Sequence, residues 1–211
     1  MNCLIIAGSP DCDVELIRDE ALSCDLLICA DRGYSHAKRA GVIPDIVIGD
    51  FDSCRDEVAG DFETVKLNTD KDFTDTLVCA EKALESGCKD ITILSALGGR
   101  LDHTLANFYL LSFINSKGGR AVLLSAKERI ELMPKGTFWF DDLKGLTFSL
   151  FPFGCESAVL SVKGARYELD EYTLKSEVPI GVSNVFSSER CEIKVSSGAV
   201  IIIINQNNDF L

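Results

Sequence analysis

The 211-residue chain lacks several features that would place it in a specialised class of protein. No apolar run approaches the roughly 20 residues that a membrane-spanning helix needs, which argues against a membrane protein. The nine cysteines include no C-x-x-C pair and are odd in number, which argues against a disulfide framework or a zinc site. Scattered thiols of this kind predict a reducing compartment, the cytoplasm.

Basic residues are also few, because 21 lysines and arginines stand against 33 acidic residues and leave a net charge of -12. Such a charge argues against a nucleic-acid partner, which needs a basic surface. A phosphate-bearing substrate would have to arrive with a metal ion or meet a local basic patch. The opening residues, MNCLIIAGSPDCD, have no basic region before their apolar run and predict a first β-strand, not a secretory signal.

Residues 1 to about 130 alternate short apolar segments with helical patterns. The predicted strands are 3–7, 25–30, 45–50, 64–67, 90–97 and 120–125. The predicted helices are 14–23, 34–41, 74–87 and 101–114. Continuous apolar strands between helices are typical of a parallel sheet that is covered on both faces. The first half therefore predicts a doubly wound α/β domain, with bounds of 1–133.

The second half has a different sequence pattern, because β-rich segments follow one another after Pro134 without a long helical pattern. These segments are 136–142, 146–153, 158–169, 191–198 and 199–205, separated by glycine, serine and charged turns. Short strands at this spacing indicate an antiparallel sandwich or barrel. We expect a second, all-β sandwich domain over 134–211.

Aspartates follow the predicted parallel strands at four separate places, where the chain leaves the sheet. They are Asp31, then Asp50 with Asp52, then Asp70, Asp72 and Asp75, and finally Asp102. The carboxyl ends of parallel strands meet at one edge, where α/β proteins bind ligands. Mg²⁺ takes oxygen ligands from a few carboxylates and from substrate phosphates. The pattern predicts an Mg²⁺ and phosphate site at this edge.

Each aspartate taken alone has a simpler explanation, since acids are favoured at the first turn of a helix. Asp70 and Asp72 could cap the helix that follows, and Asp31 and Asp102 could start theirs. Capping explains Asp50 with Asp52 less well, because one cap does not need two acids. The two carboxylates would project to the same side of a strand and repel each other.

The stretch LGGRLDHTLAN (97–107) carries a second candidate phosphate site. Gly98 and Gly99 would let the backbone approach a ligand closely, and Arg100 is a bidentate partner for phosphate. Asp102 could reach the metal, while His103 could support the substrate or simply start a helix. The alternative is an ordinary strand-loop-helix connection with a surface arginine. Elsewhere, His36 is expected to be structural, and Cys54 has no evident general base and is not assigned as a nucleophile.

Six stretches together resemble one family, thiamine pyrophosphokinase. They are ADRGYSHA (30–37), PDIVIGDFDS (44–53), DKDFTDT (70–76), GGRLDHTLAN (98–107), GARYEL (164–169) and PIGVSNVF (179–186). The resemblance runs from about residue 3 to residue 204. It implies transfer of pyrophosphate from ATP to the hydroxyethyl group of thiamine, with release of AMP. It also implies a homodimer whose thiamine sites lie between subunits.

The resemblance also implies roles for individual residues. The catalytic residues, which also surround Mg²⁺, would be Asp50, Asp52, Asp75 and Asp102. The substrate-binding residues would be Asp31, Ser53, Asp72, Thr74, Arg100, His103, Asn107, Ser183 and Asn184. Among these, Arg100 would contact phosphate, and Ser183 and Asn184 would help to hold thiamine.

Two departures and two alternatives accompany this interpretation. Arg32 stands where the family often has glycine, and Lys71 stands where some members have glutamine. One alternative is a phosphatase of the haloacid dehalogenase kind, with Asp50 as nucleophile and Asp52 as acid/base. The other is a thiamine- or nucleotide-binding protein without catalysis. The later lysine and acidic pair of the phosphatase class are not found in the required order.

Overall fold

The structure, a computed structural model, describes residues 1–51, 60–68 and 73–207. It divides into two compact units, Met1–Ala126 and Lys127–Leu211. The division falls before β7 (Glu128–Met133), because this strand pairs antiparallel with β14 (Val200–Asn205) of the second unit. The predicted boundary at 133/134 lies on the other side of β7, which the sequence pattern had not indicated as a strand.

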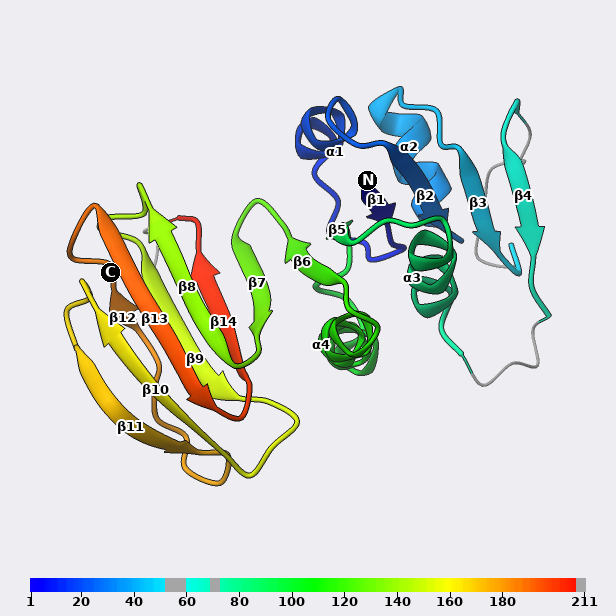
Figure 1. Cartoon of the computed structure of the whole chain (residues 1–211). Coiled ribbons are helices and arrows are strands. Elements are labelled where there is room, and N and C mark those ends of the chain that lie inside the picture. The colour runs from blue at the N-terminus through cyan, green and yellow to red at the C-terminus, as the bar shows by residue number, and fades with distance from the viewer. Residues whose placement is uncertain (52–59, 69–72, 208–211) are drawn as a thin grey trace. The chain divides into compact units, whose positions relative to one another are not determined.

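The first unit contains a parallel sheet with the strand order β6-β5-β1-β2-β3-β4 (Figure 1). Its strands are β1 (Asn2–Ile6), β2 (Leu26–Ala30), β3 (Ile46–Gly49), β4 (Glu63–Lys66), β5 (Asp90–Leu94) and β6 (Arg120–Leu124). The chain adds β2, β3 and β4 on one side of β1 and then returns to add β5 and β6 on the other. The strand order therefore reverses between β1 and β5, and the loops that follow these two strands leave the same edge.

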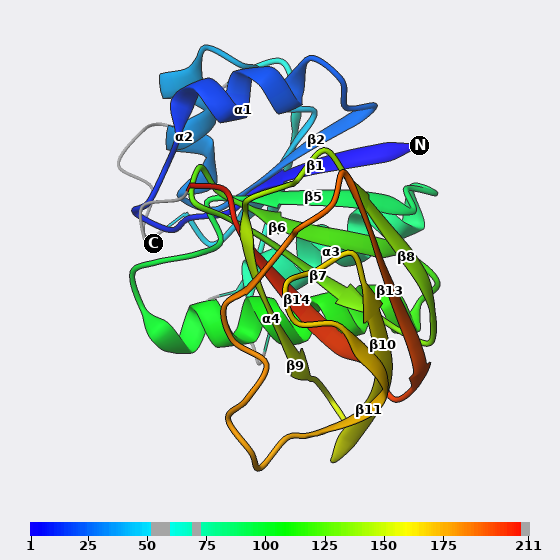
Figure 2. The ribbon, with the colours of Figure 1, turned by 90° about the vertical axis from the view of Figure 1, so that its left-hand side faces the viewer.

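Helices cover both faces of this sheet (Figures 1 and 2). On one face, α1 (Val14–Ala21) and α2 (Gly33–Ala40) pack against each other and against β1. On the other, α3 (Asp75–Glu85) packs on β1, β2 and β3, and α4 (Leu101–Ser116) packs on β6. Cover on both faces explains the continuous apolar strands, since Cys3, Leu4, Ile5 and Ile6 of β1 are all buried.

The local sequence explains where the helices of the first unit begin and end. Asp13 caps α1 by accepting hydrogen bonds from the Glu15 and Leu16 amides at 3.0 and 3.1 Å. Gly41 ends α2 with a left-handed backbone, φ +71°, which glycine adopts without a steric cost. The predicted doubly wound α/β fold of the first half is confirmed.

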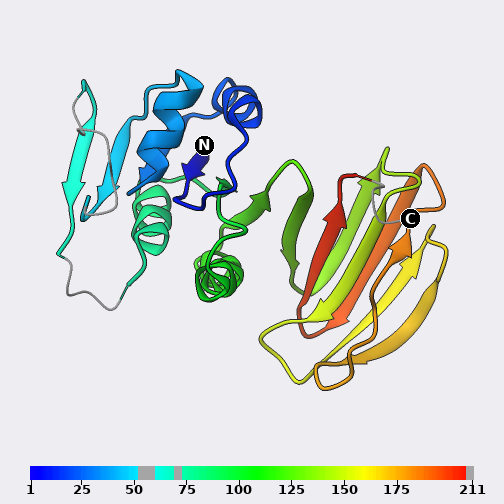
Figure 3. The ribbon, with the colours of Figure 1, turned by 180° about the vertical axis from the view of Figure 1, so that it is seen from behind.

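The second unit is a sandwich of antiparallel strands (Figure 3). One sheet has the order β12-β9-β14-β7 and the other β11-β10-β13-β8. The remaining strands are β8 (Gly136–Asp141), β9 (Thr147–Pro152), β10 (Ser157–Lys163), β11 (Leu169–Lys175), β12 (Asn184–Val185) and β13 (Arg190–Ser197). This confirms the predicted all-β sandwich, to which the structure adds β7, β11 and the two-residue β12.

Alternating inward-facing residues of the two sheets form the core of the second unit. Leu160 and Val162 of β10 and Ile193 of β13 are fully buried in it. Phe148 and Phe186 pack with ring centroids 4.3 Å apart. Each unit therefore has its own hydrophobic core.

None of the described helices is long and apolar enough to cross a membrane.

Candidate active site

A cavity of about 670 Å³ lies at the carboxyl edge of the parallel sheet. It is lined from five places: 7–10 after β1, 30–32 at the end of β2, 73–76 at the start of α3, 95–96 and 98–100 in the loop after β5, and His103 and Asn107 of α4. Reversal of the strand order between β1 and β5 leaves a crevice between their loops, which is where open α/β sheets bind ligands. The volume lies within the range of about 300–1,000 Å³ typical of small-molecule sites.

Three residues that follow parallel strands adopt left-handed backbone conformations. Asp31 after β2 has φ 44°, Phe51 after β3 has φ 65°, and Ser95 after β5 has φ 52°. Such conformations are costly outside glycine and tend to cluster at functional sites. Asp31 also packs closely on β3, because a Cβ added to Gly49 would lie 2.9 Å from the Asp31 Cα. The backbone geometry thus fixes the position of Asp31 at the carboxyl end of β2.

The start of α3 brings Thr74 and Asp75 to the cavity. Thr74 is the N-cap of α3, and its Oγ1 accepts a hydrogen bond of 3.2 Å from the Leu77 amide. Asp75 is the first residue of the helix, where the helix dipole favours a negative charge or a bound anion near the free amides. Thr74, as the N-cap, therefore favours a helix that begins at Asp75.

We expect Thr74→Ala to lower the free energy of unfolding by about 1 kcal/mol, the usual cost of losing an N-cap hydroxyl. Thr74→Ser keeps the hydroxyl and should stay close to the parent chain. Urea unfolding followed by circular dichroism measures both variants. Equal loss of stability in the two variants would assign the effect to the Thr74 methyl group instead of the cap.

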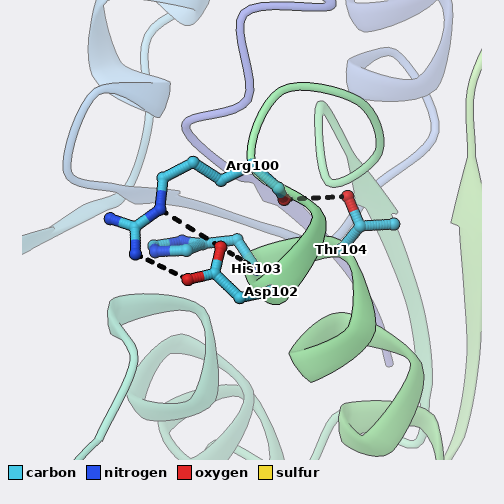
Figure 4. A network of polar contacts seen from close by, with 4 residues as sticks. All are labelled: Arg100, Asp102, His103 and Thr104. Atoms are coloured by element: carbon cyan, nitrogen blue, oxygen red, sulfur yellow. Dashed lines mark hydrogen bonds and ion pairs between the residues drawn. The ribbon is translucent and has the colours of Figure 1, made fainter.

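The start of α4 carries an exposed ion pair (Figure 4). Arg100 Nε and Nη2 donate to the two carboxylate oxygens of Asp102 at 3.1 and 2.6 Å. Hydrogen bonds from Arg100 are the main cause that lowers the pKa of Asp102. Asp102 is thus ionised at neutral pH, and its Oδ1 also accepts the His103 amide at 2.9 Å.

The ion pair joins two residues for which the sequence predicted ligand contacts. Arg100 was expected to bind phosphate and Asp102 to bind the metal ion. Arg100 lines the cavity, whereas Asp102 is not among the lining residues. A phosphate contact through Arg100 Nε and Nη2 requires the pair to open. Exposed pairs contribute little to stability and exchange readily, so the contact does not prevent those roles.

The structure brings together only part of the predicted set. Six predicted residues line the cavity: Asp31, Thr74, Asp75, Arg100, His103 and Asn107. Asn107 is buried and donates a hydrogen bond of 2.8 Å to the Ala96 carbonyl, so it also supports the loop after β5. Asp50, which follows β3, is half-buried and does not line the cavity. Asp52, Ser53 and Asp72 lie outside the described residues.

The two predicted thiamine contacts lie in the second unit. Asn184 is buried, and its side chain holds the backbone of Tyr167 through Tyr167 N to Oδ1 at 3.0 Å and Nδ2 to Tyr167 O at 2.8 Å. Oδ1 also accepts the Val185 amide at 2.9 Å. Ser183 has a left-handed backbone, φ 56°, and its amide donates to Ser149 Oγ at 3.1 Å. The amide group of Asn184 is therefore committed to the neighbouring backbone.

Sequence reasoning missed the loop after β1 and one aromatic residue. Gly8, Ser9 and Pro10 line the cavity, as does Phe73, which is 61% exposed. Pro10 lies so close to the loop after β5 that a Cβ added to Gly99 would be 2.8 Å from Pro10 Cδ. The signal was present as Gly-Ser-Pro after a strand, but only the strand order places it beside Gly98 and Gly99.

Both units match known protein families. Residues 17–123 match the family described as "Thiamin pyrophosphokinase, catalytic domain". Residues 136–200 match "Thiamin pyrophosphokinase, vitamin B1 binding domain". The chain belongs to the thiamine pyrophosphokinase family.

Individual members of the thiamine pyrophosphokinase family align over most of the chain. Thiamine pyrophosphokinase of Bacillus subtilis is 28% identical over 208 residues, covering 94% of this chain and 96% of the relative. Thiamine pyrophosphokinase 1 of rice is 31% identical and covers 78% of this chain and 67% of the relative. The crystal structure of the Bacillus subtilis enzyme superposes with a TM-score of 0.86, at 25% identity, over 98% of this chain and 100% of that one.

The match confirms the resemblance that the motifs indicated. It also decides against the phosphatase alternative, because both halves match domains of one family in the expected order. The match to the catalytic domain covers the cavity-lining residues at the end of β2, in α3 and α4 and in the loop after β5. The loop after β1 precedes the matched residues, which begin at residue 17.

Proposed function

We propose that this chain is a thiamine pyrophosphokinase, which transfers the pyrophosphoryl group of ATP to the hydroxyl oxygen of thiamine and releases AMP. One observation carries the proposal: the cavity with Asp31, Asp75 and Arg100 lies in the half that matches the family's catalytic domain. The other half matches its vitamin B1 binding domain. Thiamine is a cation, and the acidic chain suits that substrate.

The reaction forms a bond between the thiamine oxygen and the β-phosphorus of ATP and breaks the bond to the AMP oxygen. The hydroxyl proton passes to a carboxylate or to water, and negative charge shifts to AMP. Arg100 is suited to hold a phosphate group with two parallel hydrogen bonds once it leaves Asp102. Gly98 and Gly99 have φ values of +77° and +71°, a conformation that glycine adopts readily, and without a Cβ their backbone lies open beside the cavity. Such sites act mainly through positioning and fixed charge.

Mg²⁺ is the metal ion that we propose, with Asp50, Asp52, Asp75 and Asp102 as its ligands. The donors fit the ion, since carboxylate oxygens suit a hard cation and the pKa of Asp102 is lowered by Arg100. Among the described residues no three carboxylate, histidine or cysteine groups lie together as a metal site, and Asp52 is outside them. When bound, the cation would neutralise charge on the phosphates.

A homodimer with shared sites is part of the proposal. The cavity of the first unit would hold ATP, and the Ser183–Asn184 segment of the partner subunit's sandwich would hold thiamine. The family resemblance supports this arrangement, as does the separation of the nucleotide-side and thiamine-side motifs into two units. The cytoplasm is the proposed location, supported by the eight described cysteines, none of which forms a disulfide in the described part of the chain.

The purified chain is expected to release AMP from ATP only when thiamine and Mg²⁺ are both present. EDTA should abolish turnover and excess Mg²⁺ should restore it, because the carboxylates alone repel the phosphates of ATP. Separation of the nucleotides by ion-exchange chromatography measures the products. Formation of ADP and thiamine monophosphate would place the attack at the γ-phosphorus and contradict the proposed reaction, and AMP formation without thiamine would contradict the substrate.

A further inference from the structure

The loop after β1 and the loop after β5 are tied to each other at the cavity. The Ser9 amide donates to the Ser95 carbonyl at 2.9 Å, continuing the hydrogen bond from the Ala7 amide to the Leu94 carbonyl. Ser9 Oγ donates to the Leu97 carbonyl and lies 3.3 Å from the Gly98 carbonyl. Ser9 thus holds the segment that leads directly into Arg100.

Ser9 is itself held from α2 by a buried histidine. His36 is 2% exposed, and its Nε2 lies 2.8 Å from the Ser9 carbonyl oxygen. A carbonyl oxygen can only accept a hydrogen bond, so Nε2 must carry the proton. His36 Nδ1 is then an unprotonated nitrogen, buried without a hydrogen-bond partner in the described part of the chain.

The surroundings of His36 keep the ring neutral. Burial is the main cause that lowers its pKa, and the charges of Arg32 and Arg39 lower it further, although the bond to Ser9 opposes the shift. A neutral ring has only one N–H, and the structure places it on the Ser9 carbonyl. His36 does not line the cavity, whereas Ser9 does, so the contact with the Ser9 carbonyl lets His36 act on a ligand through Ser9.

We propose that His36 is a positioning residue for the nucleotide side of this site. Its Nε2–H holds the Ser9 carbonyl, and Ser9 holds the loop after β5 that presents Gly98, Gly99 and Arg100 to phosphate. The inference rests on the proposed function, because it assigns the cavity to ATP. It goes beyond that function in giving a role to a residue that no ligand would touch. Loss of the contact should lower kcat/KM for ATP and leave the KM for thiamine nearly unchanged, since the thiamine-side motif lies in the other unit.

Steady-state kinetics of three variants test this role. His36→Leu fills the site without an N–H, and His36→Gln retains a side-chain N–H that can reach Ser9. Ile17→Val trims a buried side chain of α1 in the same core and serves as the control for lost stability. We expect His36→Leu to lower kcat/KM for ATP about tenfold, as loss of one hydrogen bond gives, with the KM for thiamine nearly unchanged. His36→Gln should recover most of the loss, and Ile17→Val should match the parent chain.

A kcat/KM for ATP in His36→Leu equal to that of Ile17→Val would overturn the inference. Equal loss in His36→Leu and His36→Gln would also overturn it, because the N–H would then not matter. A parent chain without thiamine-dependent AMP formation would overturn the proposed function and this role with it. An active parent with an unaffected His36→Leu would overturn this inference alone.

Nitrogen NMR of the full chain tests the contact even if His36→Leu fails to fold. The sequence has only two histidines, His36 and His103, so two imidazoles contribute signals. We expect one ring to be the Nε2–H tautomer with a slowly exchanging proton, and that signal to be absent from His36→Gln. A protein in which neither ring shows a protected Nε2–H would overturn the inference without any measurement of activity.

Discussion

Replacing Asp75 with asparagine is expected to lower thiamine-dependent AMP formation at least ~100-fold, the loss that follows removal of one preorganised charge from an active site. Asp75 begins α3 and lines the cavity with Asp31 and Arg100. Asparagine has nearly the same size, so the shape of the cavity is kept. The negative charge that would hold a cation or receive the hydroxyl proton is lost.

The effect of Asp75→Asn on the free energy of unfolding should be small. Asparagine at the first turn of α3 gives up a favourable interaction with the helix dipole, worth about 0.3–1 kcal/mol. It also removes one of several like charges near the cavity, which relieves repulsion in the metal-free protein. Thermal unfolding without added metal measures the balance of the two terms.

Asp90→Asn is the matched control for Asp75→Asn. Asp90 is the exposed first residue of β5, at the amino end of the same sheet, so the same charge change occurs far from the cavity along the strands. Surface substitutions of this kind usually change stability by no more than about 0.5 kcal/mol, and turnover should match the parent. Equal turnover in Asp75→Asn and Asp90→Asn would limit Asp75 to a structural role in the first turn of α3.

A mixed dimer of two inactive variants is expected to regain about half of the parental activity, since two-fold symmetry gives two equivalent sites. One chain carries Asp75→Asn and the other Asn184→Ala. In shared sites, one site collects both changes and the other has neither. Asn184→Ala should be nearly inactive, because it removes three hydrogen bonds that hold the Tyr167 and Val185 backbone.

The control for this experiment places both changes in one chain and pairs it with an unchanged chain. In shared sites each site then carries one change, and no activity should return. In sites built from a single chain the unchanged chain would remain active, so the two pairings give opposite patterns. Chains with different affinity tags must be co-expressed and purified through both tags, because the subunits of a stable dimer exchange slowly. Activity in the control pairing alone would overturn the shared-site proposal and leave the reaction intact.

The sequence predicted the elements of the first unit well because its central strands β1, β2 and β3 are buried on both faces. Their apolar runs are short and bounded by helices whose caps are visible, such as Asp13 and Gly41. In the second unit β7 (ERIELM) was missed, since Glu128, Arg129 and Glu131 break its apolar pattern. Glu131 is nevertheless buried and paired with Arg129 at 2.6 Å, a compensation that no local pattern reveals.

The candidate site was predicted where it depends on strand ends and missed where it depends on strand order. Asp31, Asp75 and Arg100 were found because each follows a strand or begins a helix. Ser9 and Pro10 were missed because β1 and β5 are far apart in sequence and become neighbours only in the sheet. The side-chain partners of Arg100 and Asn184 were also beyond sequence reasoning, because such contacts depend on how the loops fold.

In laboratory evolution, Asp31 and Ser95 are positions at which selection for heat resistance and selection for turnover should diverge. Each has a left-handed backbone that glycine would adopt with less strain, at a saving on the order of 1 kcal/mol. Asp31 and Ser95 also line the cavity, so the same substitutions would change its walls. A library enriched by heating alone would therefore accumulate stable, inactive variants at these positions, and a productive screen would have to demand AMP formation in every round.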